Sequence, residues 1–167
     1  LGGAILLLVA ACSNVTVKRP AGDTIPELKK DLWTGTWQGP ENFRGVSRIK
    51  DAKAGIIELK SLEKDENGRE EEPLLLAVRE LGNRQVITAL DTKKPGEPGP
   101  FFRAVVTDEF AAFFPVREDL IRKAVRDKSI SGREIRKNHA GGNEEDKAVE
   151  IDQFGRGEAA KLLPAGT

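Results

Sequence analysis

The fold is decided by residues 74–90, which read LLLAVRELGNRQVITAL. In an extended chain successive side chains point to opposite faces, and three apolar residues then share one face of the first half: Leu74, Leu76 and Val78. The pair Gly82-Asn83 follows, and a glycine at the first position of a two-residue loop is typical of a type II′ turn. The chain returns over residues 84–90. This stretch therefore predicts an antiparallel hairpin.

The second face of this hairpin also carries apolar side chains. We assign four residues to the outer strand faces: Leu75, Ala77, Ile87 and Ala89. An apolar strand face is either covered by another element or exposed as a patch that meets a partner. We therefore expect something to lie against this side of the hairpin.

Further segments repeat the strand pattern. Residues 55–63 alternate apolar and charged side chains, and residues 101–106 and 109–114 flank Thr107-Asp108 as a second hairpin. Residues 130–135 and 147–152 are shorter candidates. We predict a mainly β fold with minor α, an antiparallel sheet of about seven or eight strands that is curled or closed into a barrel.

One amphipathic helix is predicted over residues 116–127, directly after Pro115. Its apolar residues recur at helical spacing: Leu120, Ile121, Ala124 and Val125. Acidic residues occupy its first turn and basic residues its last, as the helix dipole favours. We expect its apolar stripe to cover one open end or one face of the sheet.

The first twelve residues are of a different kind. They read LGGAILLLVAAC, contain no charge and end at Cys12. The apolar run of eight residues from Ala4 to Ala11 is too short to span a bilayer, which takes about 20 residues. It fits the apolar region of a secretory signal followed by small residues. The alternative is a buried N-terminal helix in which the cysteine is a small apolar residue.

Residues Val9-Ala10-Ala11-Cys12 resemble the lipobox of bacterial lipoproteins. In that family the cysteine is lipidated through its sulfur and the chain is cut just before it. The resemblance implies lipidation at Cys12 and attachment to a membrane, because two or more acyl chains hold a protein there stably. Ser13 after the cysteine further implies the outer membrane, facing the periplasm.

We therefore divide the chain into three parts. Residues 1–11 are interpreted as the remnant of a signal peptide. Residues 12–31 are interpreted as the lipidated cysteine and a flexible tether, because they are polar and contain two prolines. Residues 32–167 are predicted to form a single β-rich domain, long enough to bury a core.

The body opens with Gly35-Thr36-Trp37. This resembles the Gly-x-Trp motif at the first strand of lipocalin-type barrels, where the tryptophan lies at the closed end. The resemblance implies a lipocalin-like barrel. The same order of lipobox, Gly-Thr-Trp, strands and a late helix is similar to that of small bacterial lipoproteins of unassigned role.

Phenylalanines gather in the second hairpin. They either fill the core or surround an apolar cavity, and pockets for small molecules are lined mostly by apolar and aromatic side chains. If a cavity exists, its candidate ligand-binding residues are Trp37, Phe102, Phe110 and Phe113.

Composition excludes several functions. Lysine plus arginine number 27, as do aspartate plus glutamate, so the formal net charge is zero. A nucleic-acid-binding domain needs a basic face, and we predict no nucleic-acid partner. One cysteine and one histidine, His139, leave no metal-binding set, and we predict no metal and no cofactor. Phosphate-binding loops and nucleophile motifs are also missing from the sequence, so we predict no enzyme.

The sequence thus predicts an envelope lipoprotein that acts by binding. The first hypothesis is an apolar small molecule or lipid held in a barrel-like cavity. The alternative is a protein-interaction or assembly module of the cell envelope that uses an outer strand face.

Overall fold

The structure contains the hairpin predicted at residues 74–90, and this hairpin lies at the middle of the sheet. Strand β6 (Leu74–Leu81) pairs antiparallel with β7 (Arg84–Leu90) in a register that runs from Leu75 opposite Leu90 to Leu81 opposite Arg84. Gly82 adopts a φ of 63° while Asn83 keeps a negative φ, the sign pattern of a II′ turn.

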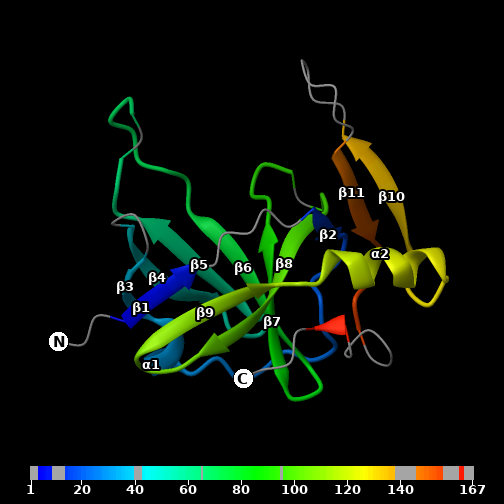
Figure 1. Cartoon of the computed structure of the whole chain (residues 1–167). Helices are drawn as coiled ribbons and strands as arrows, with labels where there is room; N and C mark the ends of the chain where they lie inside the picture. Colours follow the sequence, from blue (N-terminus) through cyan, green and yellow to red (C-terminus); the bar gives the residue numbers. More distant parts are fainter. Residues whose placement is uncertain are drawn as a thin grey trace.

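The computed structural model describes residues 4–8, 14–39, 43–64, 66–94, 96–137, 146–155 and 162–163. In these ranges eleven strands form one mixed sheet, in the order β10-β11-β2-β8-β7-β6-β5-β4-β3-β1-β9 (Figure 1). The other strands are β1 (Ala4–Leu8), β2 (Val15–Val17), β3 (Gly35–Gln38), β4 (Arg44–Asp51), β5 (Ile56–Ser61), β8 (Gly99–Val106), β9 (Phe110–Pro115), β10 (Gly132–Lys137) and β11 (Asp146–Ile151). The two helices are α1 (Lys30–Trp33) and α2 (Glu118–Arg126).

The prediction of a mainly β fold with minor α is confirmed, with two corrections. The sheet is mixed rather than antiparallel, because β1 runs parallel to β3 and β9, and β11 runs parallel to β2. The described part of the chain holds eleven strands, more than predicted, and two of the additional ones, β1 and β2, come from segments interpreted as signal and tether.

The sheet is curled, but it is not the closed barrel that the lipocalin resemblance implies. Strand β9 pairs with β8 on one side and with β1 on the other, which brings the two ends of the curl together. Among the described strands only the five-residue β1 lies between β9 and β3, and its register with β3 covers two pairs, Ala4 with Trp37 and Ile5 with Gln38. Strands β2, β11 and β10 continue outward from β8 as an extension of the sheet.

Alternation along the strands creates two separate cores. The first core lies inside the curl and contains Trp33, Trp37, Ile57, Leu76, Val78, Ile87, Ala104 and Phe113, among others. The second core lies against β7, β8 and the extension, and contains Val15, Val17, Leu81, Val86, Phe101, Ile121, Val149, Ile151 and Phe154, among others. Neighbouring residues thus go to different cores, as Val86 and Ile87 do.

Helix α2 confirms the helix predicted at 116–127, and its position shows which face it covers. Ile121 is fully buried and Ala124 nearly so, and both belong to the second core. In Figure 1 the helix lies beside β10 and β11, on the opposite side of the molecule from β1. It therefore covers the extension rather than an open end of the curl.

Part of the segment interpreted as a flexible tether packs against the sheet. Val15 and Val17 are buried in β2, which pairs with both β8 and β11. Ala21 is fully buried, and its backbone N–H donates to the Thr88 hydroxyl at 2.9 Å. The few apolar residues of this stretch therefore contribute to the core. The prolines and charges around them made the sequence resemble a tether.

The prediction that four apolar residues of the hairpin share its outer face is wrong. These residues are Leu75, Ala77, Ile87 and Ala89. The hairpin register pairs Val78 with Ile87 and Leu76 with Ala89, and cross-strand partners share a face. Ile87 and Ala89 therefore point into the first core. Ala77 lies on the other face but is fully buried, so these four residues form no contiguous exposed patch.

Candidate binding site

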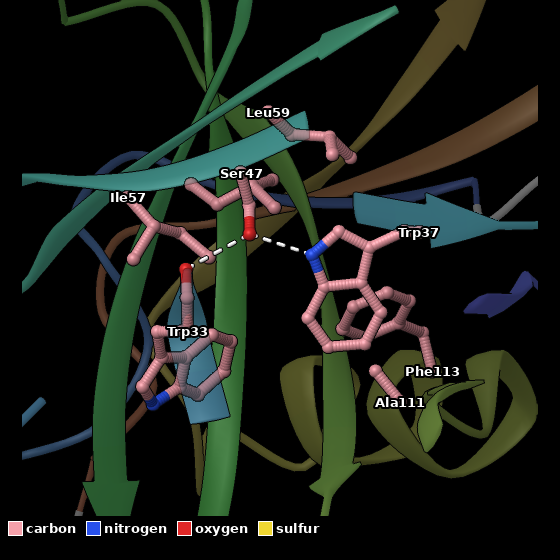
Figure 2. Close-up of a pocket in the computed structure, with 8 residues that line it drawn as sticks. Trp33, Trp37, Ser47, Ile57, Leu59, Ala111 and Phe113 are labelled. Atoms are coloured by element: carbon pink, nitrogen blue, oxygen red, sulfur yellow. Dashed lines mark hydrogen bonds between the residues drawn. The ribbon is translucent and has the colours of Figure 1, made fainter. Parts of the chain in front are cut away.

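Trp37 is held by a chain of hydrogen bonds that links three elements. Its indole Nε1 donates to the Ser47 hydroxyl at 2.6 Å, and that hydroxyl donates to the Trp33 carbonyl oxygen at 2.8 Å (Figure 2). A serine hydroxyl has one proton to give and lone pairs to accept, so both bonds are compatible. All three residues are buried. The network ties β3, β4 and α1 together with no buried polar atom of this set left unpaired.

A small apolar cavity lies beside Trp37. Its lining residues are Trp33, Trp37, Ser47, Ile57, Leu59, Leu76, Ala111 and Phe113 (Figure 2). Its volume is about 20 Å³. A single water occupies roughly 10–15 Å³ on this measure, so the cavity as described has no room for an organic ligand.

A second apolar cavity of about 70 Å³ adjoins the first. It is lined by Leu59, Leu74, Leu76, Ile87, Ala89, Phe102 and Phe113, of which Leu59, Leu76 and Phe113 line both cavities. Binding pockets for drug-sized molecules measure about 300–1,000 Å³. Each of these two cavities, as the described residues form them, is therefore too small for such a molecule.

The structure brings together part of the predicted site. Trp37 and Phe113 line the first cavity, and Phe102 joins Phe113 at the second. Phe110 is half-buried and lines neither. Cys12, the predicted lipidation site, and His139 lie outside the described residues.

Strand alternation divides the other phenylalanines. Phe101 points into the second core, where its ring centroid lies 4.9 Å from that of Phe154. Phe114 carries the Arg103 guanidinium over its ring at 5.5 Å. The concentration of phenylalanines in the sequence is therefore not one aromatic pocket.

Sequence reasoning missed two residues of this region, Trp33 and Ser47. Trp33 ends the short helix α1, just before the strand β3 that holds Trp37. Ser47 lies in β4 between exposed neighbours, and its inward position follows the same alternation that buries Gly45. Strand alternation could have predicted that Ser47 points into the core. The sequence gives no sign of which residues form hydrogen bonds with its hydroxyl.

Removing the Ser47 hydroxyl should destabilise the domain. Ser47→Ala leaves the buried Trp37 N–H without its acceptor, and an unsatisfied buried polar group costs about 1–3 kcal/mol. We expect that loss in the free energy of unfolding measured in urea. The matched control is Ser61→Ala on the neighbouring strand, where the hydroxyl only accepts an exposed bond from Glu63. Equal effects of the two changes would contradict the role assigned to Ser47.

Two buried carboxylates of the described chain pair with largely exposed cationic side chains. Glu58 is buried, and its carboxylate accepts a bond from Arg48 Nε at 2.7 Å and lies 3.3 Å from Lys50 Nζ. Hydrogen bonding from Arg48, followed by that from Lys50, lowers the pKa of Glu58 below its usual value of 4.5. A second cluster joins Glu150 to Arg133 at 2.9 Å and to Lys18 at 3.6 Å.

The Glu58 cluster predicts a pH dependence of stability. A carboxylate whose folded-state pKa is lowered stabilises the fold above its unfolded-state pKa, and this contribution is lost as the pH falls through the folded-state value. We expect Glu58→Gln to cost about 0.5–1 kcal/mol at pH 7, since Arg48 and Lys50 are largely exposed and screened. The difference from the parent protein should shrink below pH 4.5 in urea unfolding curves. A difference that grows at acid pH would contradict this assignment.

No set of three or more metal-ligating His, Cys, Asp or Glu side chains is found within the described ranges. Among the described residues no helix is long and apolar enough to cross a membrane. Two open surface grooves of about 400 and 430 Å³ are larger than the interior cavities. The larger groove is lined by both signs of charge, with Lys18, Lys50, Asp91 and Glu97 around Leu75 and Leu90.

Comparison with protein-family models, with curated proteins and with solved structures finds no match to this chain.

Proposed function

We propose that this chain is a lipoprotein of the bacterial cell envelope, anchored through lipid on Cys12 in the outer membrane and facing the periplasm. It acts by binding and not by catalysis. The anchor rests on the sequence alone: an uncharged apolar run, two small residues and then the only cysteine. Acyl chains on that cysteine would hold the domain at the membrane surface.

Within this role, we infer that the partner is another protein rather than a lipid carried inside the fold. The observation that supports this choice is the size of the interior cavities, about 20 and 70 Å³. Even together they are several times smaller than the roughly 300 Å³ at which ligand pockets begin. A packed interior leaves recognition to strand edges and to the surface.

The anchor is tested by metabolic labelling with an alkyne fatty acid in bacteria that express the complete gene. The parent protein should incorporate the label, and Cys12→Ala should lose it. Ser13→Ala changes the adjacent residue without removing the sulfur and should keep it. Label that survives Cys12→Ala would refute the anchor.

Carriage of an apolar small molecule is the second candidate, favoured by the wholly apolar side chains of the second cavity. A fluorescent fatty acid titrated into the purified protein decides between the two. We expect no saturable binding at one molecule per chain. Saturable binding that Phe113→Ala weakens and Phe114→Ala leaves unchanged would favour carriage instead.

A further inference from the structure

A slot for one extended strand lies between β3 and β9. In the described chain Ala4–Leu8 occupies it as β1, parallel to both neighbours. The register places Ile5, Leu6, Leu7 and Leu8 beside Phe110, Ala111, Ala112 and Phe113. On the other side Ala4 and Ile5 lie beside Trp37 and Gln38. One short segment thus joins the two ends of the curl.

The occupant of this slot is the same segment that the proposed processing removes. Cleavage before Cys12 would take away all of β1. Strand β3 would keep its pairing with β4, and β9 its pairing with β8, but within the described ranges each would then have one unpaired edge. An unpaired edge presents a row of N–H and C=O groups that is a template for another chain.

The walls of the slot suit an apolar occupant. Strand β3 reads GTWQ and β9 reads FAAFFP, so neither carries a charge. Trp37, Ala111 and Phe113 also line the 20 Å³ cavity of the first core. Residues paired in register on adjacent strands project to the same face. An occupant placed beside Ala111 and Phe113 would therefore meet the first core with alternate side chains.

We propose that the mature protein binds an extended apolar segment of another polypeptide in the slot between β3 and β9. This proposal rests on the proposed processing at Cys12. The segment adds as a strand parallel to both, in the register that Ala4–Leu8 occupies. Main-chain hydrogen bonds on two sides would supply affinity, and the core positions beside Ala111 and Phe113 would select apolar side chains. The leader of this chain would then fill the slot until it is cleaved.

Disulfide trapping tests the register directly. The mature protein carrying Ala112→Cys is mixed with a lysine-flanked peptide of residues 4–8 that carries Leu7→Cys, under mild oxidation. The two cysteines occupy paired positions, and adjacent strands bring Cα atoms within the span of a disulfide. The control peptide carries Leu6→Cys, which places the thiol on the opposite face. We expect the matched peptide to cross-link about tenfold more than the control.

A second pair of cysteine positions keeps the proposal testable if the Ala112→Cys variant does not fold. Phe110→Cys, which replaces a half-buried residue, should cross-link to a peptide carrying Ile5→Cys. A Cys12→Ser chain purified with residues 1–11 in place has its slot filled. With Ala112→Cys added, it should cross-link to the peptide at least about tenfold less than the mature form.

The outcomes separate the two proposals. A lipidated chain that begins at Cys12 but shows no preference for the matched peptide overturns the strand slot and leaves the anchor standing. A purified chain that retains residues 1–11 overturns both. Loss of the cross-link in excess fatty acid would assign the slot to an acyl chain, and cross-linked dimers of Ala112→Cys in place of the peptide adduct would assign it to a second copy. Either result overturns the peptide partner.

Discussion

Replacing Phe101 by alanine is expected to remove about 3–5 kcal/mol from the free energy of unfolding, the usual cost of deleting a large buried aromatic side chain. Phe101 is fully buried in β8 and packs against Phe154. It lies in the same core as Ile121 of α2. The substitution therefore leaves a cavity where helix and sheet meet, and the surrounding atoms cannot fully close it.

Urea unfolding followed by circular dichroism measures this loss. Leu62→Ala is the control, because Leu62 is 50% exposed and its truncation should change stability by less than about 0.5 kcal/mol. A loss below about 1 kcal/mol for Phe101→Ala would mean that the second core contributes little. The fold would then depend on the first core alone.

The second large effect is expected at Gly22, in the segment that the sequence predicts to be a tether. Gly22 has a φ of 106°, and a Cβ there would lie 2.6 Å from the Arg79 Cβ and 2.9 Å from a Val86 methyl group. Backbone strain and overpacking then act together, and we expect Gly22→Ala to cost about 2–4 kcal/mol. The midpoint of thermal unfolding should fall accordingly.

Gly68→Ala is a matched control for Gly22→Ala. Gly68 also has a positive φ, 74°, but nothing lies within 4 Å of its added Cβ. It should therefore show the strain alone, about 1 kcal/mol. Equal effects at the two glycines would contradict the packing of residues 20–24 on β6 and β7, and the absence of any effect at Gly22 would restore the flexible tether.

Local patterns predicted the hairpins and the helix well. Alternation and Gly82-Asn83 gave β6 and β7 with their bounds, and Pro115 marked the end of β9 and the approach to α2. Each of these signals depends on residues that are close together in the chain, so each can be recognised in the sequence alone.

It was harder to predict which face of a strand points into the core than to predict which strands pair. Alternation along one strand says which residues share a face but not which face is inside. The two-residue turn carries that information, because Leu81 opposite Arg84 makes Val78 the partner of Ile87. Applying this register to the sequence would have placed Ile87 in the core with Val78.

Long-range contacts could not be predicted from local pattern. Strand β2 pairs with β8 and β11, whose residues lie far along the chain, and a three-residue strand has almost no periodicity of its own. The apolar leader segment shows the same limit: its composition fits a signal, yet nothing local tells that it pairs with β3 and β9. In the candidate site, Trp37 and Phe113 meet by such non-local contact, while Phe110 does not join them.

Mass spectrometry of the N-terminal peptide, on protein purified from bacterial membranes, shows directly whether the chain is cut and lipidated at Cys12. We expect a chain that begins at Cys12 and carries the added mass of lipid on that residue. A chain that still contains Ala4–Leu8, with an unmodified Cys12 thiol, would contradict it. That result would make β1 a permanent strand of the fold and remove both the anchor and the open slot.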